Sequence, residues 1–281
     1  MVIGTSARLA DILARSRLLS SDDLTSAKTL VGQDGDPREA ARRLVGAGLL
    51  TTWQAQQLLA GRHAFLLGKY KLLDKLGEGG MGAVYKAVQT TTGRLVAIKV
   101  MSENAVKGPG TVSRFHREIR AVAALEHPNI VAAIDADQVG ETHFLVMQYA
   151  EGRDLKQWIK EFRRLPVDWS CECIRQAALG LQHAHERGLA HRDIKPSNML
   201  VVDDPGGGLP LVKILDMGLA RFTSEAQCTV LTQTGQVLGT IDYIAPEQAQ
   251  DTKGAGIRAD IFSLGASLFH MLTCLLYTSP S

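Results

Sequence analysis

Roughly the first 66 residues carry apolar positions at helical spacing and show no strand-like alternation. Two segments there resemble each other: LLSSDDLTSAKTLV (18–31) and LLTTWQAQQLLAG (49–61) each open with a Leu pair and two hydroxyl residues. Hydroxyl side chains accept hydrogen bonds from the unsatisfied N–H groups of a first helical turn. The predicted N-caps are Ser20 or Ser21 and Thr51 or Thr52.

A further helix is expected in DPREAARRLVGAGLL (36–50), because Pro37 lies near its first turn and two glycines lie near its end. Residues 1–67 are therefore predicted to form a small all-α domain of three or four short helices. Packing alone and the binding of a protein partner both stay open as its role.

From Tyr70 the pattern changes to short strand-like runs, YKLLDKLG, AVYKAVQ and LVAIKV, separated by turns rich in Gly or Thr. VSRFHREIRAVAAL (112–125) predicts an amphipathic helix and HFLVMQY (143–149) a buried strand. Beyond Gly152 helical patterns dominate. A β-rich lobe followed by a helical one is an α+β arrangement, with a cleft expected between the lobes.

Composition narrows the functional classes. The chain is 45% hydrophobic and 21% charged with a net charge of +2, which is too balanced for a nucleic-acid binder. No apolar run is long enough to span a membrane, and the N-terminus lacks a signal-peptide core. The four cysteines form no disulfide framework; Cys171 and Cys173 are interpreted as small buried core residues. These features predict a cytoplasmic protein.

A glycine-rich stretch, LGEGGMGAV (76–84), lies between two strand-like runs. Glycines in tight turns are the simple explanation of Gly77, Gly79 and Gly82. Their position favours a hairpin over a nucleotide instead of a dinucleotide fold, because backbone N–H groups without a neighbouring Cβ can approach phosphate oxygens closely.

Lys99 lies in the otherwise apolar strand VAIKV (96–100). A buried lysine without an anionic partner is costly, so the side chain either reaches the surface or meets anions. Glu118, on the following helix, is the expected partner, and the pair could grip α- and β-phosphates.

The octapeptide HRDIKPSN (191–198) places Asp193, Lys195 and Asn198 close together around a proline. VKILDMGLA, GTIDYIAPE and ADIFSLG follow downstream. In this order and spacing the motifs resemble a eukaryotic-type protein kinase over roughly residues 68–273. The resemblance implies a two-lobed, protein-kinase-like fold with ATP and Mg²⁺ as cofactors and protein Ser/Thr hydroxyls as substrates.

The same resemblance assigns roles to residues. Asp193 would orient or accept the proton of the attacking hydroxyl, and Lys195, which is typical of the Ser/Thr-specific branch, would neutralise the γ-phosphate. Asn198 and Asp216 would hold Mg²⁺, and His191 would be structural. The implied nucleotide-binding residues are Leu76, Gly77, Gly79, Gly82, Val84, Ala97, Lys99, Met147, Gln148 and Ala150.

One motif departs from the family, since Met217 follows Asp216 where a Phe is usual; an unbranched apolar side chain should fill the same pocket. Thr232 and Thr234 resemble the autophosphorylated pair of bacterial kinases of this type. A phosphate there could pair with Arg192 and order the segment, while a merely polar loop is the alternative.

The helical segment joined directly to the glycine-rich region resembles kinases of planctomycete-like bacteria. At the other end, CLLYTSPS (274–281) resembles the translation of a sequencing adapter and is interpreted as non-native, with an ordinary variable loop as the alternative. The predicted domains are a helical domain (1–67) and a C-terminally truncated kinase domain (68–281) with an N-lobe (68–150), a C-lobe (151–273) and the foreign tail (274–281).

Family members continue for several more helices, which would include an arginine that pairs with Glu247. We therefore expect exposed apolar faces on residues 259–273, low stability and weak activity for this polypeptide. A membrane anchor could follow the missing helices. The alternative function is a pseudokinase or scaffold acting through the N-terminal helices, and a small-molecule kinase on the same fold is a third hypothesis.

Overall fold

The computed structural model describes residues 5–32, 35–80, 82–103, 117, 119–202, 210–217, 241–251 and 256–276. By its internal packing the chain divides into two compact units. The first comprises Met1–Met101 with Asp137–Val146, and the second comprises Ser102–Ala136 with Met147–Ser281.

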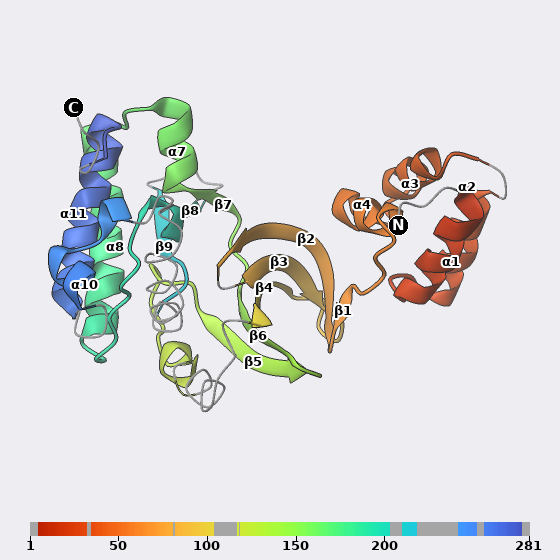
Figure 1. Ribbon diagram of the computed structural model, residues 1–281, viewed down its shortest axis with the longest axis horizontal. Coiled ribbons are helices and arrows are strands. Elements are labelled where there is room, and N and C mark those ends of the chain that lie inside the picture. Colours follow the sequence, from red (N-terminus) through yellow and green to blue (C-terminus); the bar gives the residue numbers. More distant parts are fainter. Residues whose placement is uncertain are drawn as a thin grey trace. The chain divides into compact units, whose positions relative to one another are not determined.

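The first unit opens with a bundle of helices, drawn in red to orange in Figure 1. They are α1 (Ser6–Ser16), α2 (Ser21–Val31), α3 (Pro37–Gly46) and α4 (Thr52–Leu59). Ser20 caps α2, Thr51 caps α4 and Pro37 opens α3, which confirms the helix starts expected from the sequence. Apolar side chains at helical spacing, such as Leu9 and Leu44, form a fully buried core among them.

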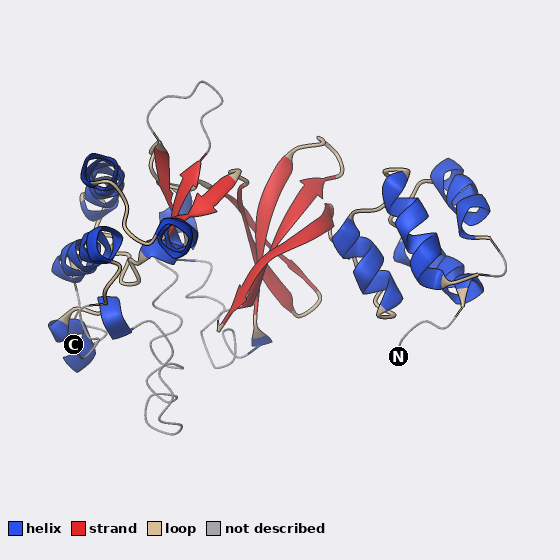
Figure 2. Cartoon of the chain, turned by 90° about the horizontal axis from the view of Figure 1, so that it is seen from above, coloured by secondary structure: helices blue, strands red, loops and turns tan. Residues whose placement is uncertain are grey.

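A six-stranded sheet with the order β1-β2-β3-β4-β6-β5 follows the bundle (Figure 2). The strands are β1 (Leu66–Leu67), β2 (Tyr70–Gly79), β3 (Gly82–Gln89), β4 (Leu95–Met101), β5 (Ala133–Val139) and β6 (Thr142–Gln148). Adjacent β2, β3 and β4 are antiparallel. Tyr70, Ile98 and Phe144 are buried on one side of the sheet, which explains why these strands carry β-branched and aromatic residues.

The second unit contains a smaller sheet and several helices. Its strands are β7 (Gly152–Asp154), β8 (Met199–Val202) and β9 (Leu211–Ile214). Its helices are α7 (Leu155–Phe162), α8 (Val167–His185), η1 (Pro196–Asn198), η3 (Ile241–Tyr243), α10 (Pro246–Gln250) and α11 (Ile257–Thr273). Leu155, Leu181, Met199, Ile214 and Met217 belong to one buried cluster that joins the helices to the sheet.

These elements confirm the predicted α+β class with a helical segment in front. The helix expected at 112–125 is helical over residues 119–123, and much of its remainder lies outside the described residues. Within the part of the chain that the structure describes, no helix combines the length and the apolar character that crossing a bilayer requires.

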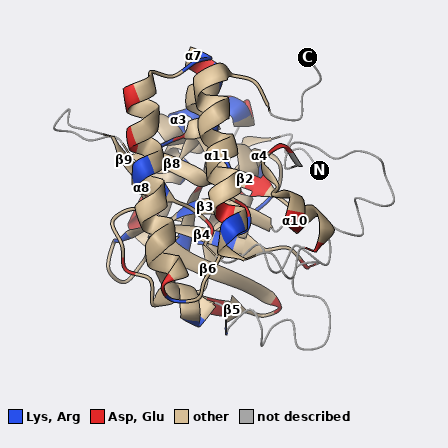
Figure 3. Cartoon of the chain, turned by 90° about the vertical axis from the view of Figure 1, so that its left-hand side faces the viewer, with Lys and Arg blue, Asp and Glu red and all other residues tan. Residues whose placement is uncertain are grey.

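The surface of the second unit differs from the sequence prediction at one cysteine. Cys171 is exposed whereas Cys173 is buried, so the interpretation of both as core residues is wrong for Cys171. The two lie two positions apart on α8, and a helix turns by about 200° over that interval. In Figure 3 helix α8 carries both acidic and basic side chains, while most of its length is neither. Helix α11 exposes Ile261 and Phe262, as expected for residues 259–273.

Candidate active site

His191 lies at the base of the loop that contains Asp193, and it is fully buried. Its Nε2 lies 2.8 Å from the carbonyl oxygen of Leu215. Because a carbonyl only accepts, Nε2 carries the proton, and Nδ1 accepts from the backbone N–H of Asp193 at 3.2 Å. Both ring nitrogens are occupied by backbone groups, which agrees with a structural role for His191 and leaves no lone pair for proton abstraction.

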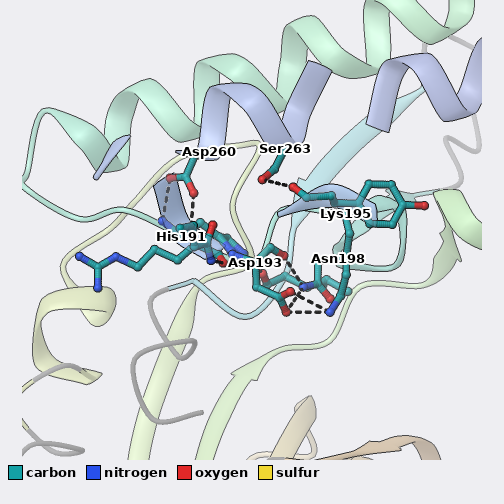
Figure 4. A network of polar contacts seen from close by, with 10 residues as sticks. His191, Asp193, Lys195, Asn198, Asp260 and Ser263 are labelled. Carbon is teal, nitrogen blue, oxygen red and sulfur yellow. Dashed lines mark hydrogen bonds and ion pairs between the residues drawn. The ribbon is translucent and has the colours of Figure 1, made fainter. Parts of the chain in front are cut away.

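Two polar side chains of this loop converge on the carboxylate of Asp193 (Figure 4). Lys195 Nζ donates to both carboxylate oxygens of Asp193, at 2.8 and 2.9 Å. Asn198 Nδ2 donates to the main-chain oxygen of Asp193 at 2.7 Å and to its Oδ2 at 3.0 Å. Pro196 opens the short helix η1, which turns the chain so that Asn198 can reach back. The side chain of Asp193 is 23% exposed, so it is accessible to a ligand.

Asp216 is brought to this loop by strand pairing. In the β8–β9 ladder Met199 pairs with Ile214, and one step beyond it the N–H of Leu215 donates to the carbonyl oxygen of Asn198 at 2.9 Å. Asp216 follows immediately, so antiparallel pairing places it at the same end of the hairpin as Asn198. Its φ of 56° is left-handed, a conformation that Asp tolerates better than most residues.

The loop is anchored from α11 by a residue whose role the sequence analysis missed. Asp260 is fully buried, and its carboxylate accepts from the backbone N–H groups of His191 at 2.8 Å and Arg192 at 2.6 Å. His185 Nε2 lies 2.8 Å from the same carboxylate, which projects from α11 in Figure 4. Gln248 donates to the Arg192 carbonyl oxygen at 2.7 Å. These bonds hold Arg192 at a left-handed φ of 66°.

A second contact ties α11 to the segment before α10. Ser263 Oγ donates to the carbonyl oxygen of Tyr243 at 2.7 Å, and Tyr243 Oη lies 2.6 Å from His270 Nδ1. Burial raises the pKa of Tyr243 to about 12, and Asp242 adds to this shift. Burial also lowers the pKa of His270. The tyrosine therefore keeps its proton and donates a hydrogen bond to Nδ1 of the His270 ring.

In the first unit, Val84, Ala97 and Lys99 share one face of the sheet. Val84 is opposite Lys99 in the β3–β4 register, and residues two apart on a strand point the same way. Lys99 is 5% exposed, so its side chain is buried on this face of the sheet and does not reach solvent. Glu118, its expected partner, lies outside the described residues.

The glycine-rich hairpin closes through a pairing of Gly79 with Gly82, whose φ is 136°. A Cβ added to Gly77 or Gly79 would meet no atom within 4 Å among the described residues. Packing therefore does not explain these two glycines, whereas a ligand that approaches the backbone closely would. Leu76, at the start of the hairpin, is exposed.

The residues expected to contact an adenine lie at the end of β6 and just beyond it. Met147 is buried. The backbone N–H of Gln148 donates to the carbonyl oxygen of Ala132 at 2.9 Å, which fixes the end of β6. Ala150 lies two residues further, beyond the strand. Thr232 and Thr234 lie outside the described residues.

The oxygen atoms of Asn198 and Asp216 suit a hard cation whose remaining ligands are phosphate oxygens and water. Both hydrogen bonds of the Asn198 side chain use Nδ2, so Oδ1 is available, and Asp216 supplies a carboxylate. Among the described residues no three His, Cys, Asp or Glu side chains cluster as a complete cage. Mg²⁺ needs no such cage, because it is bound through one or two protein oxygens together with phosphates and water.

Comparison with known proteins agrees with this geometry. The chain matches the family described as "Protein kinase domain" over residues 70–279. It is 38% identical over 206 residues to the probable serine/threonine-protein kinase PknB of Lactococcus lactis, covering 73% of this chain and 31% of that protein. It is 36% identical to the serine/threonine-protein kinase PrkC of Bacillus subtilis, covering 77% and 32% respectively. The chain thus spans about a third of the length of these curated relatives.

Among solved structures, the chain is similar to the Mycobacterium tuberculosis PknI kinase domain, crystallised as a double mutant. The TM-score is 0.59 at 24% identity, over 76% of this chain and 80% of that one. At this level of identity the likeness bears on the fold alone.

Proposed function

Because the chain belongs to the protein kinase domain family, we propose that it is an ATP-dependent serine/threonine protein kinase. It would transfer the γ-phosphate of Mg-ATP to hydroxyl groups of protein substrates. The observation that carries the proposal is the convergence of Lys195 and Asn198 on the Asp193 carboxylate, with Asp216 brought alongside by the β8–β9 ladder.

In the proposed reaction the substrate hydroxyl oxygen attacks the γ-phosphorus, the bond to the β-phosphate oxygen breaks and ADP leaves. Asp193 orients the hydroxyl and takes its proton. Lys195, which contacts both oxygens of Asp193, would share its ammonium with the transferring phosphoryl group and offset the charge there. Asn198 and Asp216 would hold Mg²⁺, which neutralises nucleotide phosphates when bound.

The first unit would bind and orient the nucleotide. Lys99, with Glu118 as its expected partner, would hold the α- and β-phosphates. The hairpin glycines 77, 79 and 82 would admit phosphate oxygens close to the backbone, since neither Gly77 nor Gly79 is explained by packing. Val84 and Ala97 would cover the adenine, with the Gln148 carbonyl and Ala150 as its hydrogen-bonding partners and Met147 beside them.

Phosphate transfer from γ-labelled ATP to a generic protein substrate, followed by phosphoamino-acid analysis, tests the proposal. We expect phosphoserine or phosphothreonine, and a loss of about 10²–10⁴-fold in kcat for Asp193→Asn. Asp168→Asn is the matched control, because Asp168 is exposed at the start of α8. Equal turnover by Asp193→Asn and wild type would refute the assignment. Nucleotide binding without any transfer would favour the pseudokinase alternative.

We further propose that Thr232 and Thr234 are autophosphorylated and that the phosphates pair with Arg192. The support is the resemblance of their positions to those of bacterial kinases of this type, since both threonines lie outside the described residues. Mass spectrometry after incubation with ATP should find phosphate at these positions, and replacing both by Ala should lower kcat. A protein partner for residues 1–67 and a cytoplasmic location stay predictions of the sequence.

A further inference from the structure

Among the described residues the helical bundle meets the sheet chiefly through α4, which lies against β2 in Figures 1 and 2, and Lys71 Nζ also donates to the Leu18 carbonyl oxygen at 3.4 Å. Thr51 Oγ1 donates to the carbonyl oxygen of Leu73 at 2.6 Å. Gln54 Nε2 donates to the carbonyl oxygen of Leu72 at 2.7 Å. Gln54 is 3% exposed, so its hydrogen bond is shielded from water.

The same two side chains also form the capping box of α4. Thr51 Oγ1 accepts from the N–H of Gln54 at 3.1 Å, and Gln54 Oε1 accepts from the N–H of Thr51 at 3.0 Å. A capping box needs only the acceptor function of each side chain. Here the hydroxyl proton and the amide NH₂ remain, and both are used on β2. The cap of the helix and its attachment to the sheet are therefore one hydrogen-bonded unit.

Strand β2 needs these donors at this place. Among the described strands β1 pairs only with Tyr70 and Lys71, so beyond Lys71 this edge of β2 has no strand beside it. On the other side the register with β3 skips Leu73, passing from Leu72 to Asp74 in a bulge. Leu72 stays in register with Ala87 but its N–H donates to Phe65 on the β1 side, so its carbonyl group faces the open edge, and Leu73 lies in the bulge. Both residues are half-buried where α4 meets them, and leaving a carbonyl group unsatisfied there is costly.

An aromatic contact extends the attachment to β3. The ring of Trp53, on α4, lies 5.7 Å from that of Tyr85 and 5.7 Å from that of Phe65. Tyr85 is next to Val84 on β3, and successive side chains of a strand point to opposite faces. Trp53 therefore presses on the face of the sheet opposite to the one that carries Val84 and Lys99.

We infer that Thr51 and Gln54 are positioning residues for nucleotide binding, which fix β2 at its bulge and thereby the base of the glycine-rich hairpin that follows at Gly77. The inference rests on the proposed function, because it assigns ATP to that hairpin. It connects the N-terminal helices to catalysis, because α4 supplies hydrogen-bond donors to β2 where this edge has no neighbouring strand among those described.

Gln54→Glu tests the inference without removing the helix cap. A glutamate at this position still accepts from the Thr51 N–H, but its carboxylate cannot donate to Leu72. Gln56→Glu is the matched control, since Gln56 undergoes the same chemical change on the exposed side of α4. Thr51→Val and Thr51→Ser form a second pair, in which only serine retains the hydroxyl donor.

Two readouts are measured on the full chain. Amide hydrogen exchange of the peptide covering residues 71–80 should accelerate about tenfold in Gln54→Glu and Thr51→Val, while β4 peptides stay unchanged. The KM for ATP should rise about three- to tenfold with kcat within about twofold, because less of the hairpin is held in its binding geometry. Gln56→Glu and Thr51→Ser should match wild type in both readouts.

A general loss of folded protein would lower the apparent kcat and leave KM unchanged, so that pattern overturns the inference. Unchanged exchange in both Gln54→Glu and Thr51→Val overturns it as well. The exchange readout needs no catalysis, so it distinguishes failure of this inference from failure of the kinase proposal. If the wild-type chain transfers no phosphate but Gln54→Glu and Thr51→Val still accelerate exchange in residues 71–80, the kinase proposal fails and the attachment of α4 to β2 stands.

Discussion

Replacing Asp260 by Asn should weaken the hydrogen bonds that hold the loop of His191–Asp193 to α11. The carboxylate of Asp260 accepts three hydrogen bonds while fully buried: Oδ1 takes the Arg192 N–H, and Oδ2 takes the His191 N–H and His185 Nε2. An ionised carboxylate only accepts, so all three partners donate to it. Asparagine has the same shape but offers a single acceptor oxygen, and its NH₂ group must face at least one of these donors.

The magnitude follows from this count. Leaving one buried backbone N–H unsatisfied costs about 1–3 kcal/mol. Each remaining bond changes from a charged to a neutral acceptor and weakens by roughly 1 kcal/mol. Removing the buried charge offsets part of the loss, because the carboxylate carries its own desolvation cost. We expect the free energy of unfolding to fall by about 2–4 kcal/mol, with no cavity involved.

Urea unfolding followed by circular dichroism measures this change, and Asp168→Asn is the control. Asp168 is exposed in the first turn of α8, so its replacement should cost less than about 1 kcal/mol. Amide exchange of the peptide that contains His191 and Arg192 should also accelerate in Asp260→Asn. A loss no larger than that of the control, with unchanged exchange, would show that the loop is held by other contacts.

Two further predictions concern titration and reactivity. Burial lowers the pKa of His270, so its imidazole binds a proton more readily in the unfolded chain than in the folded one. The free energy of unfolding that depends on this difference is fully present above about pH 6.5 and falls as the pH is lowered. His270→Asn, which keeps an acceptor for Tyr243, should therefore lose less stability than wild type between about pH 8 and pH 5.5 in urea titrations, and parallel pH profiles would contradict this. Burial raises the pKa of the Cys173 thiol to about 12, whereas Cys171 is exposed, so iodoacetamide should label Cys171 and spare Cys173 in the folded protein. Equal labelling of the two thiols, read by peptide mass spectrometry, would contradict the burial.

Local signals in the sequence predicted most of the elements. Helix starts at Ser20, Pro37 and Thr51 follow from which side chains can satisfy N–H groups of a first turn, and such contacts span only a few residues. The residues of the octapeptide likewise contact one another across intervals of two to five positions, as in the bonds from Lys195 and Asn198 to Asp193. Most of the contacts within this motif therefore join residues that are close in sequence, which is why the motif could be recognised from the sequence alone.

Contacts between distant segments were not predictable in the same way. Hydrophobic periodicity shows that α4 has an apolar face, but it does not say that Thr51 and Gln54 reach a strand about 20 residues away. The same holds for Asp260, which binds backbone groups 68 and 69 positions earlier. An acid within the otherwise apolar run ADIFSLG was the available signal, because a buried carboxylate requires donors. The exposure of Cys171 depends on which side of α8 packs inward, which composition does not reveal.

The two units hold their functional residues by different physical means. In the second unit several backbone groups around Asp193 have fixed partners: the Asp193 N–H donates to His191, the Arg192 N–H donates to Asp260, and the Asn198 carbonyl oxygen accepts from Leu215. Such a loop is preorganised before any ligand arrives, so variants there should alter kcat more than KM. In the first unit the β2 arm of the glycine-rich hairpin is exposed from Asp74 onward; it is held by its pairing with β3 and, at its base, by the hydrogen bonds from α4 to Leu72 and Leu73. With ATP bound at this hairpin as proposed, variants at its base should act mainly through KM. The kinase family match at residues 70–279 does not include the N-terminal helices. On the proposed function, their attachment would support the strand that leads into the nucleotide-binding hairpin.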